Sequence, residues 1–396
     1  MEDDCVELCY GFLLFEIFKC TYSIYRQKSV LRGTIQGIVI SGARILALFP
    51  YVGKSHFDMF EPYVKELASR GHQVVVVSHF PQESPIKNLR DISLVGSVDI
   101  DSVNRINVND VLGATFFKTV EEELKELTES CNKTLSFHTV QEFMHSNENF
   151  DVVIVETFNT DCFIPFAHKF KAPLIEGVLL TLYNGVESLV TQKYVNHHFG
   201  YDTPPLSELA RNTSLILVNT HFSLNRPRPL LPNIVEVGGI HIKPIKKLPK
   251  DLEDYINGAE HGVIYFNMGS IIKTESFPTE IMNEFFQAFS ELPHRILWKW
   301  ESDEMSGKPE NVKISRWLPQ FDILNHPKVV AYIGHGGLLG TIEAVYAGVP
   351  MLGIPILGDQ GMNVASMEMS NMGVRLDFND INKQNILNAL NTILQP

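Results

Sequence analysis

The residues best suited to chemistry lie in one stretch near the end of the chain, Trp317–Asn363. Trp317 offers a flat aromatic face on which a nucleobase can stack, and the Gln320 amide can donate to and accept from a base edge. His335 stands in a glycine-rich turn between a strand and a helix, where backbone N–H groups favour a diphosphate. This set of residues predicts recognition of a nucleotide.

Further polar groups extend the same predicted site. Glu343, six residues into the helix after the turn, can accept hydrogen bonds from a ribose diol. Asp359 and Gln360 follow the next strand and suit sugar hydroxyls. Each feature alone has an ordinary explanation, because a single Trp is usually core, a His-Gly-Gly run a tight turn, and an Asp-Gln pair a helix cap. Their order and spacing together indicate a nucleotide-sugar site.

Two series of strands and helices must position these residues. From Arg44 onward, short β-rich runs alternate with amphipathic helices, the pattern of parallel sheets with crossover helices. The first series has expected strands at Arg44–Phe49, Gln73–Ser78, Asp151–Val155, Leu174–Val178 and Leu215–Val218, and an acidic helix at Phe116–Glu129. The second has strands at Gly262–Asn267, Arg295–Trp300, Val312–Ser315, Val329–Ile333 and Pro350–Ile354. We therefore predict the α/β class, with two doubly wound domains facing across a cleft.

A Pro- and Lys-rich run without periodicity separates the two series. It spans Gly239–Lys250 and predicts an interdomain linker. We expect one domain over residues 44–240 and a second over residues 241–396. Residues 1–43 are atypical, because the start is acidic, which is wrong for a signal peptide, yet Arg26–Ala43 resembles the second half of one. A damaged signal region and a genuine N-terminal extension both fit this segment.

The composition argues against several classes of protein. A formal net charge of −13 argues against a nucleic-acid partner, since binding phosphate backbones needs clustered basic residues. The five cysteines lack paired spacing, so we expect neither a disulfide framework nor a metal site. No apolar run reaches the roughly 18 residues of a transmembrane helix. Asn132 and Asn212 each begin a glycosylation sequon, which matters only in the secretory pathway.

Taken together, four short motifs resemble the signature of the UDP-glycosyltransferase family, glycosyltransferase family 1. They are Trp317–Gln320 (WLPQ), His335–Gly337 (HGG), Glu343 and Gly358–Gln360 (GDQ). The resemblance runs from about Arg44 to the last residue, and Phe150–Cys162 looks most like the insect branch. It implies the GT-B fold of two Rossmann-like domains, no metal, and no cofactor beyond a UDP-sugar co-substrate. It also implies transfer of glucose or glucuronate to a hydroxyl of a small lipophilic acceptor, with inversion and a histidine base.

The resemblance assigns a role to each residue of the donor site, which it places in the second domain. It implies uracil on Trp317 and Gln320, ribose at Glu343, donor sugar at Asp359 and Gln360, and diphosphate at Ser270, His335, Gly340 and the turn glycine Gly337. Ser270 belongs to Met268–Ser270, which resembles the family's first phosphate loop. Many relatives carry Asn where this chain has Leu339, so that side-chain contact with phosphate is absent.

The acceptor side is expected in the first domain, where His56 follows the first strand. A neutral imidazole there can take the proton of an acceptor hydroxyl, which typically contributes about 100- to 10,000-fold. From position alone His56 fits a helix-capping role better, and the family's base motif reverses that preference. The strand that begins at Phe150 leads to its expected carboxylate partner, Glu156, where the family usually has Asp. Asp161 is the second candidate, although its expected role is to cap the following helix.

The resemblance also bears on location and on rival functions. Relatives reside at the endoplasmic reticulum lumen and membrane and continue past the equivalent of Pro396, so we interpret the chain as C-terminally truncated, without a transmembrane helix or clear signal peptide. Homodimerisation is left open. Two other functions also stay open: a non-catalytic lipophile-binding pseudoenzyme or truncated isoform, and a UDP-sugar epimerase. An insect-like chain favours glucose as the donor sugar.

Overall fold

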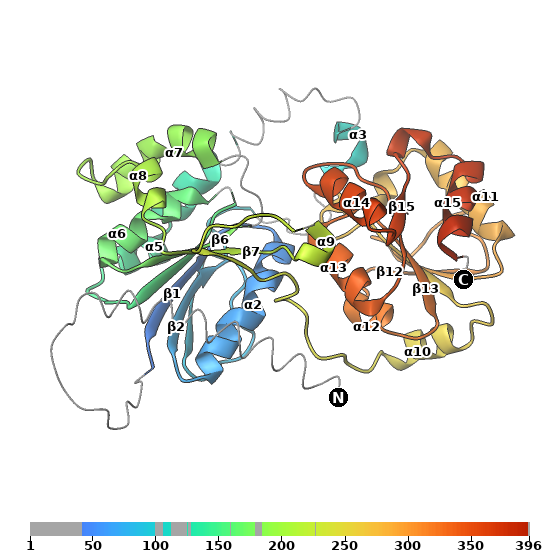
Figure 1. Cartoon of the computed structure of the whole chain (residues 1–396), viewed down its shortest axis with the longest axis horizontal. Coiled ribbons are helices and arrows are strands. Elements are labelled where there is room, and N and C mark those ends of the chain that lie inside the picture. The colour runs from blue at the N-terminus through green and yellow to red at the C-terminus, as the bar shows by residue number, and fades with distance from the viewer. Residues whose placement is uncertain are drawn as a thin grey trace.

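The computed structural model describes residues 42–99, 106–111, 125, 128–158, 160–178, 184–225 and 227–394. Within these ranges the chain forms two large parallel sheets, each covered by helices (Figure 1). The predicted α/β class is therefore confirmed. The acidic helix expected at Phe116–Glu129 falls mostly outside the described residues, as does almost all of the atypical segment 1–43.

The first sheet has seven strands, in the order β3-β2-β1-β5-β6-β7-β8, all parallel. They are β1 (Arg44–Phe49), β2 (Gln73–Ser78), β3 (Leu89–Ser93), β5 (Val152–Glu156), β6 (Leu174–Val178), β7 (Leu215–Val218) and β8 (Ile234–Glu236). The helices of this half are α2 (Lys54–Ser69), α5 (His138–Met144), η1 (Asp161–Phe163), α6 (Pro165–Phe170), α7 (Asn184–Phe199), α8 (Leu206–Arg211) and α9 (Phe222–Asn225). The strand order reverses direction between β1 and β5.

Burial on both faces explains why β1 reads as an unbroken apolar run. Leu46 and Leu48 pack into one hydrophobic cluster, and the alternating residues Ile45, Ala47 and Phe49 pack into another on the opposite face. Parallel sheets are covered on both sides by their crossover helices, so their central strands lack polar alternation. Helix α2 covers one face, and its apolar stripe recurs at helical spacing.

The second sheet has six parallel strands, in the order β12-β11-β9-β13-β14-β15. They are β9 (Val263–Asn267), β11 (Arg295–Lys299), β12 (Val312–Ser315), β13 (Val329–Gly334), β14 (Met351–Gly353) and β15 (Gly373–Arg375). Its helices are α10 (Lys250–Asn257), η2 (Thr274–Ser276), α11 (Thr279–Glu291), α12 (Gln320–Leu324), α13 (Leu338–Ala347), α14 (Gln360–Met369), η3 (Phe378–Asp380) and α15 (Lys383–Leu394). Numbered along the sheet, this is the Rossmann order 3-2-1-4-5-6, with its reversal between β9 and β13.

Every strand expected from the sequence is present, with its ends within one residue of the expected position. The strands β3, β8 and β15 were not predicted. A further two-stranded sheet was not predicted either: β4 (Ile106–Asn107) pairs in parallel with β10 (Ile272–Lys273). It brings β4 and the following α3 (Val108–Val111) from the first half of the chain onto the second half, and Figure 1 shows α3 beside the C-terminal helices.

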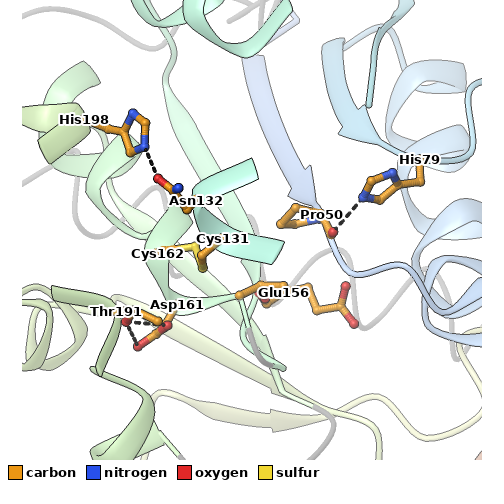
Figure 2. The surroundings of a disulfide bond; sticks show 10 residues. Pro50, His79, Cys131, Asn132, Glu156, Asp161, Cys162, Thr191 and His198 are labelled. Carbon is orange, nitrogen blue, oxygen red and sulfur yellow. Dashed lines mark hydrogen bonds between the residues drawn. A yellow bond between two sulfur atoms is a disulfide. The ribbon is translucent and has the colours of Figure 1, made fainter. Parts of the chain in front are cut away.

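One disulfide corrects the expectation of none. Cys131 and Cys162 are bonded, with their Cα atoms 6.3 Å apart, and both residues are buried (Figure 2). The bond ties the helical segment at residues 128–136 to the start of η1, just after β5. The pairing depends on how β5 packs, so neither the odd number of cysteines nor their spacing could indicate it.

Candidate active site

Each large sheet presents loops at the point where its strand order reverses. Ligands of open α/β sheets bind outside the carboxyl ends of the strands at this point. In the first sheet the loop after β1 leads to His56 on α2, and Glu156 is the last residue of β5. In the second sheet the loops after β9 and β13 carry Ser270 and His335. The topology therefore places the predicted catalytic pair and the predicted phosphate loops where such sheets hold ligands.

His56 and Glu156 form a direct buried pair. The Nδ1 atom of His56 lies 2.7 Å from Oε1 of Glu156. His56 is 8% exposed and Glu156 only 1%. A carboxylate bonded to one ring nitrogen holds the imidazole in one orientation and stabilises the imidazolium that forms when the other nitrogen takes a proton. This geometry leaves Nε2 of His56 as the ring nitrogen able to accept a proton.

Aromatic rings flank the same imidazole. The ring of Tyr51 lies 4.3 Å from that of His56, and the ring of Phe158 lies 4.6 Å from it. A Cβ atom at Gly53 would stand 2.6 Å from the Tyr51 ring, so a side chain there would displace that ring from its place beside His56. Aromatic rings therefore lie beside the His56 imidazole and suit a lipophilic ligand.

Asp161 does not approach His56 in the same way. Its carboxylate oxygens lie 3.2 and 3.4 Å from the Thr191 hydroxyl of α7, which donates to them. In Figure 2 the side chains of Asp161 and Glu156 point away from each other. The expected capping role is wrong, because the N-cap residues of η1 and α6 are Thr160 and Ile164. The structure thus brings Glu156, and not Asp161, to the imidazole.

His335 is held between two glycines. A Cβ atom at Gly269 would stand 2.6 Å from Cε1 of His335, and one at Gly337 would stand 2.5 Å from its Nε2. Gly269 also has a φ of +83°, a region that side chains disfavour. Burial lowers the pKa of His335 to about 4, so the imidazole is neutral at neutral pH. The loops after β9 and β13 therefore both pack against His335. Ser270 follows Gly269 in the chain and is half-buried.

A hydrogen-bonded chain crosses the site beside this histidine. The Asn267 side chain accepts from the backbone N–H of Gly269 at 2.8 Å and donates to Oε1 of Gln320 at 2.7 Å. Gln320 in turn donates to Oε2 of Glu343 at 2.7 Å. A Cβ atom at Gly340 would stand 3.0 Å from the Gln320 amide nitrogen, so a glycine there leaves room for this amide. The phosphate loop is thereby connected to the predicted ribose carboxylate.

Glu343 is a largely buried carboxyl, with its side chain 16% exposed, and its pKa is displaced. Burial raises its pKa to about 7, while the hydrogen bond from Gln320 opposes the shift and the nearby Asp58 and Asp322 add to it. Its Oε1 atom lies 4.0 Å from Nε2 of His241. The neutral and the ionised forms of Glu343 are therefore both populated near neutral pH.

Asp359 and Gln360 stand at the start of α14, as expected, and both hold their loop. Oδ2 of Asp359 accepts from Asn363 at 2.8 Å. Oε1 of Gln360 accepts from the backbone N–H groups of Ile356 and Leu357 at 2.9 and 3.1 Å. The second oxygen of Asp359 and the amide nitrogen of Gln360 are the groups left for sugar hydroxyls.

Trp317 is 62% exposed, and it is not the core residue that a single Trp usually is. It lines a pocket of about 450 Å³ together with Pro319, Asp322 and the linker lysines Lys246 and Lys247. An exposed aromatic face at the mouth of a pocket suits stacking by a flat ring.

Leu339 makes an apolar contact between the two halves of the chain. Its side chain packs against the hydrophobic cluster of α2 and β1 in the first half of the chain. Its sequence position in α13 is next to Leu338 at the helix start, so this contact joins the two halves beside the glycine turn.

Two residues of the site escaped sequence reasoning. Asn267 could have been found, because a polar residue at the carboxyl end of a buried strand is a signal of function. His241 could not, because it lies in a Lys-rich segment that resembles an ordinary linker.

Comparison with solved structures confirms the fold class. The crystal structure of LpCGTa in complex with UDP matches with a TM-score of 0.57, covering 90% of this chain and 91% of that chain at 16% identity. The two Rossmann-like sheets, each with a reversal of strand order, therefore form the GT-B fold.

Comparison of sequences identifies the family. The family described as UDP-glucoronosyl and UDP-glucosyl transferase matches residues 200–396. UDP-glucosyltransferase 2 of Dactylopius coccus is 36% identical over 406 residues, which cover 89% of this chain and 78% of that protein. UDP-glucuronosyltransferase 2B10 of Homo sapiens is 38% identical over 190 residues, covering 48% of this chain and 36% of that protein. The chain belongs to the UDP-glycosyltransferase family and is a UDP-hexose-dependent glycosyltransferase.

The described residues contain no helix long and apolar enough to cross a membrane.

Proposed function

We propose that this enzyme transfers glucose from UDP-glucose to the hydroxyl of a small lipophilic acceptor, with inversion at the anomeric carbon. The observation that carries the proposal is the buried pair of His56 and Glu156, 2.7 Å apart at the reversal point of the first sheet. The aromatic rings of Tyr51 and Phe158 beside it support a lipophilic acceptor. The similarity to an insect UDP-glucosyltransferase over most of the chain supports glucose over glucuronate.

The proposed reaction is a single displacement. The acceptor oxygen attacks the anomeric carbon while the bond from that carbon to the UDP oxygen breaks, and UDP leaves with the bonding electron pair. The acceptor proton passes to Nε2 of His56, and Glu156 stabilises the resulting imidazolium. Attack from the face opposite to the leaving group inverts the configuration, and no covalent sugar intermediate forms.

The proposed donor site lies across the second sheet. The glycine turn at Gly336 and Gly337 opens α13, whose N-terminus favours the diphosphate, and the neutral His335 ring can add a hydrogen bond. Glu343 accepts from the ribose diol, and Trp317 stacks on uracil. UDP-glucose then serves as the only co-substrate, bound without a separate cofactor.

We also propose that the reaction takes place in the lumen of the secretory pathway. The disulfide between Cys131 and Cys162 supports this location, since disulfides persist in oxidising compartments. The sequons at Asn132 and Asn212 are consistent with it.

The test is incubation of the purified chain with UDP-glucose or UDP-glucuronate and a panel of phenols. We expect β-glucosides from the α-linked donor, detected by mass spectrometry and assigned by the anomeric NMR coupling. His56→Asn should remove turnover and leave UDP affinity unchanged. Retained anomeric configuration would exclude the single displacement. Phenol binding without turnover would instead support the non-catalytic lipophile binder, and sugar isomerisation would support an epimerase.

A further inference from the structure

His241 is a buried histidine whose hydrogen-bonding capacity is largely unused. Its side chain is 4% exposed, and neither ring nitrogen makes a hydrogen bond of normal distance and angle in the structure. A polar group that is buried without a hydrogen bond costs free energy, so its presence calls for an explanation. The residue therefore points to a ligand-bound state in which it gains a partner.

The nearest candidate partner is the carboxylate of Glu343. Nε2 of His241 lies 4.0 Å from Oε1 of Glu343, just beyond hydrogen-bonding distance. The other oxygen, Oε2, is already held by the Gln320 amide. A donor at Oε1 would fix both oxygens and leave lone pairs on each for a ligand, because a carboxylate accepts about four hydrogen bonds.

The protonation state of His241 suits a donor that stays neutral. Burial lowers its pKa to about 4, a weak hydrogen-bonding interaction with the backbone of Leu339 opposes this shift, and Lys243 adds to it. The charged groups around the pair are Lys243 on the same segment, Asp58 on α2 and Asp322 on α12. A neutral imidazole has one N–H, so it can donate from Nε2 without bringing a second charge into the site.

The linker that carries His241 is attached to both halves of the chain. Lys243, two residues further on, forms an ion pair with Glu61 of α2 at 2.9 Å. Glu61 is paired with Lys65 as well, and these two lysines together hold its pKa at about 2 against the opposing effect of burial. The segment that carries His241 is therefore held against α2 by Lys243, and His241 itself lies beside Glu343 of α13.

We propose that His241 is a positioning residue of the donor site: when the UDP-sugar is bound, its Nε2–H donates to Oε1 of Glu343 and orients that carboxylate toward the ribose diol. This rests on the proposed role of Glu343 at the ribose. A displacement of about 1 Å brings the two atoms into hydrogen-bonding distance.

The experiment compares the affinities of the full chain for UDP and for 2′-deoxy-UDP, by calorimetry. A hydrogen bond to a charged group corresponds to roughly a tenfold or greater difference in affinity, so the unaltered chain should prefer UDP by about that factor. His241→Phe should bring the ratio of the two affinities to within about twofold of unity, while His241→Gln, which keeps an N–H donor, should retain part of the preference. In a Glu343→Gln background, His241→Phe should cause no further loss.

The control is His72→Phe, since His72 is a buried histidine at the opposite end of the first sheet. It should lower stability and leave the ratio of affinities unchanged. A folded His241→Phe protein with an unchanged ratio would overturn the proposal, as would a further loss in the Glu343→Gln background. If His241→Phe does not fold, a ratio unchanged in His241→Gln and in His241→Leu would overturn it equally. Absence of any UDP binding in the unaltered chain would instead contradict the proposed function.

Discussion

The Nδ1 atom of His56 lies 2.7 Å from Oε1 of Glu156, although 100 residues separate them in the chain. They meet because β1 and β5 are neighbours in parallel register, with Leu48 paired to Val155. The segments that leave the two strands therefore emerge at the same edge of the sheet. Glu156 is the last residue of β5, and its side chain reaches the imidazole from there.

Removal of the charge from Glu156 should affect turnover alone. Glu156→Gln keeps the size of the side chain and removes the anion that stabilises the imidazolium, so we expect a loss of about 100-fold or more in kcat. UDP affinity should stay within about twofold, because this residue lies on the first sheet. Asp161→Asn, in contrast, should lower the melting temperature and leave kcat unchanged. The opposite pattern in two folded variants would exchange the two roles.

Glu343 should make the stability of the protein depend on pH. Its pKa is raised by burial from 4.5 to about 7, above its unfolded value, so its stabilising contribution is complete below about pH 4.5 and is lost as the pH rises through 7. Glu343→Gln should therefore be more stable than the unaltered chain at pH 8, by on the order of 1 to 3 kcal/mol. Urea unfolding at pH 5, 6.5 and 8 measures this. A difference independent of pH would contradict it.

The glycines around His335 should not tolerate a side chain. Gly269→Ala places a Cβ atom 2.6 Å from the His335 ring at a φ of +83°, and we expect a cost of about 1 to 3 kcal/mol together with weaker UDP binding. Gly361→Ala is the matched control, because a Cβ atom there has no neighbour within 4 Å. Equal melting temperatures and UDP affinities for the two variants would show that the ring has room to move.

The disulfide should be detectable and stabilising. Cys131 and Cys162 are 31 residues apart, and a cross-link of this length contributes roughly 3 to 4 kcal/mol in the chain-entropy account. We expect both thiols to be alkylated only after reduction and unfolding, and the double Cys→Ala variant to melt at a lower temperature. Full alkylation of both residues in the unreduced, unfolded chain would contradict the pairing.

The two sequons should differ in occupancy when the chain is expressed through the secretory pathway. Asn212 is exposed at the end of α8, whereas Asn132 accepts from His198 at 3.1 Å and the Thr134 of its sequon is 1% exposed. Folding around the adjacent disulfide competes with modification of Asn132. Asn212→Gln should therefore remove the glycosidase-sensitive shift in gel mobility. A shift lost in Asn132→Gln instead would reverse this assignment.

The strands at the centre of each sheet were predictable, and among the edge strands only β12 was predicted, whereas β3, β8 and β15 were not. Gln73–Ser78 reads as a strand because four consecutive valines suit burial on both faces, and it occupies β2 as expected. β3, at the edge of the same sheet, contains Arg90 and Asp91 and has no fully buried residue, so no pattern marked it. Periodicity reports burial, and edge strands are only partly buried.

The residues of the site also fall into a group that local sequence predicts and a group that it does not. Motifs that lie at strand ends, such as the glycine turn containing His335, could be found because their position follows from the local sequence. The disulfide and the contact between His241 and Glu343 depend on how distant segments pack, and no local pattern encodes that. The choice of Glu156 over Asp161 as the partner of His56 came from family resemblance, and the distance of 2.7 Å agrees with it.

The docking of β4 and α3 on the second half of the chain has a consequence for biosynthesis. Val108 is fully buried in the hydrophobic core of the second sheet, and its backbone N–H donates to the Ser276 hydroxyl, 168 residues later. At a translation rate of about 5 to 20 residues per second, this segment waits for roughly 10 to 30 s before its binding partner leaves the ribosome. The nascent first half therefore leaves Ile106 and Val108 without their packing partners during that interval, when chaperones have access to them. Co-expression of the two halves as separate polypeptides would shorten the time before this segment meets its packing partner. That time would then depend on the concentrations of the two polypeptides.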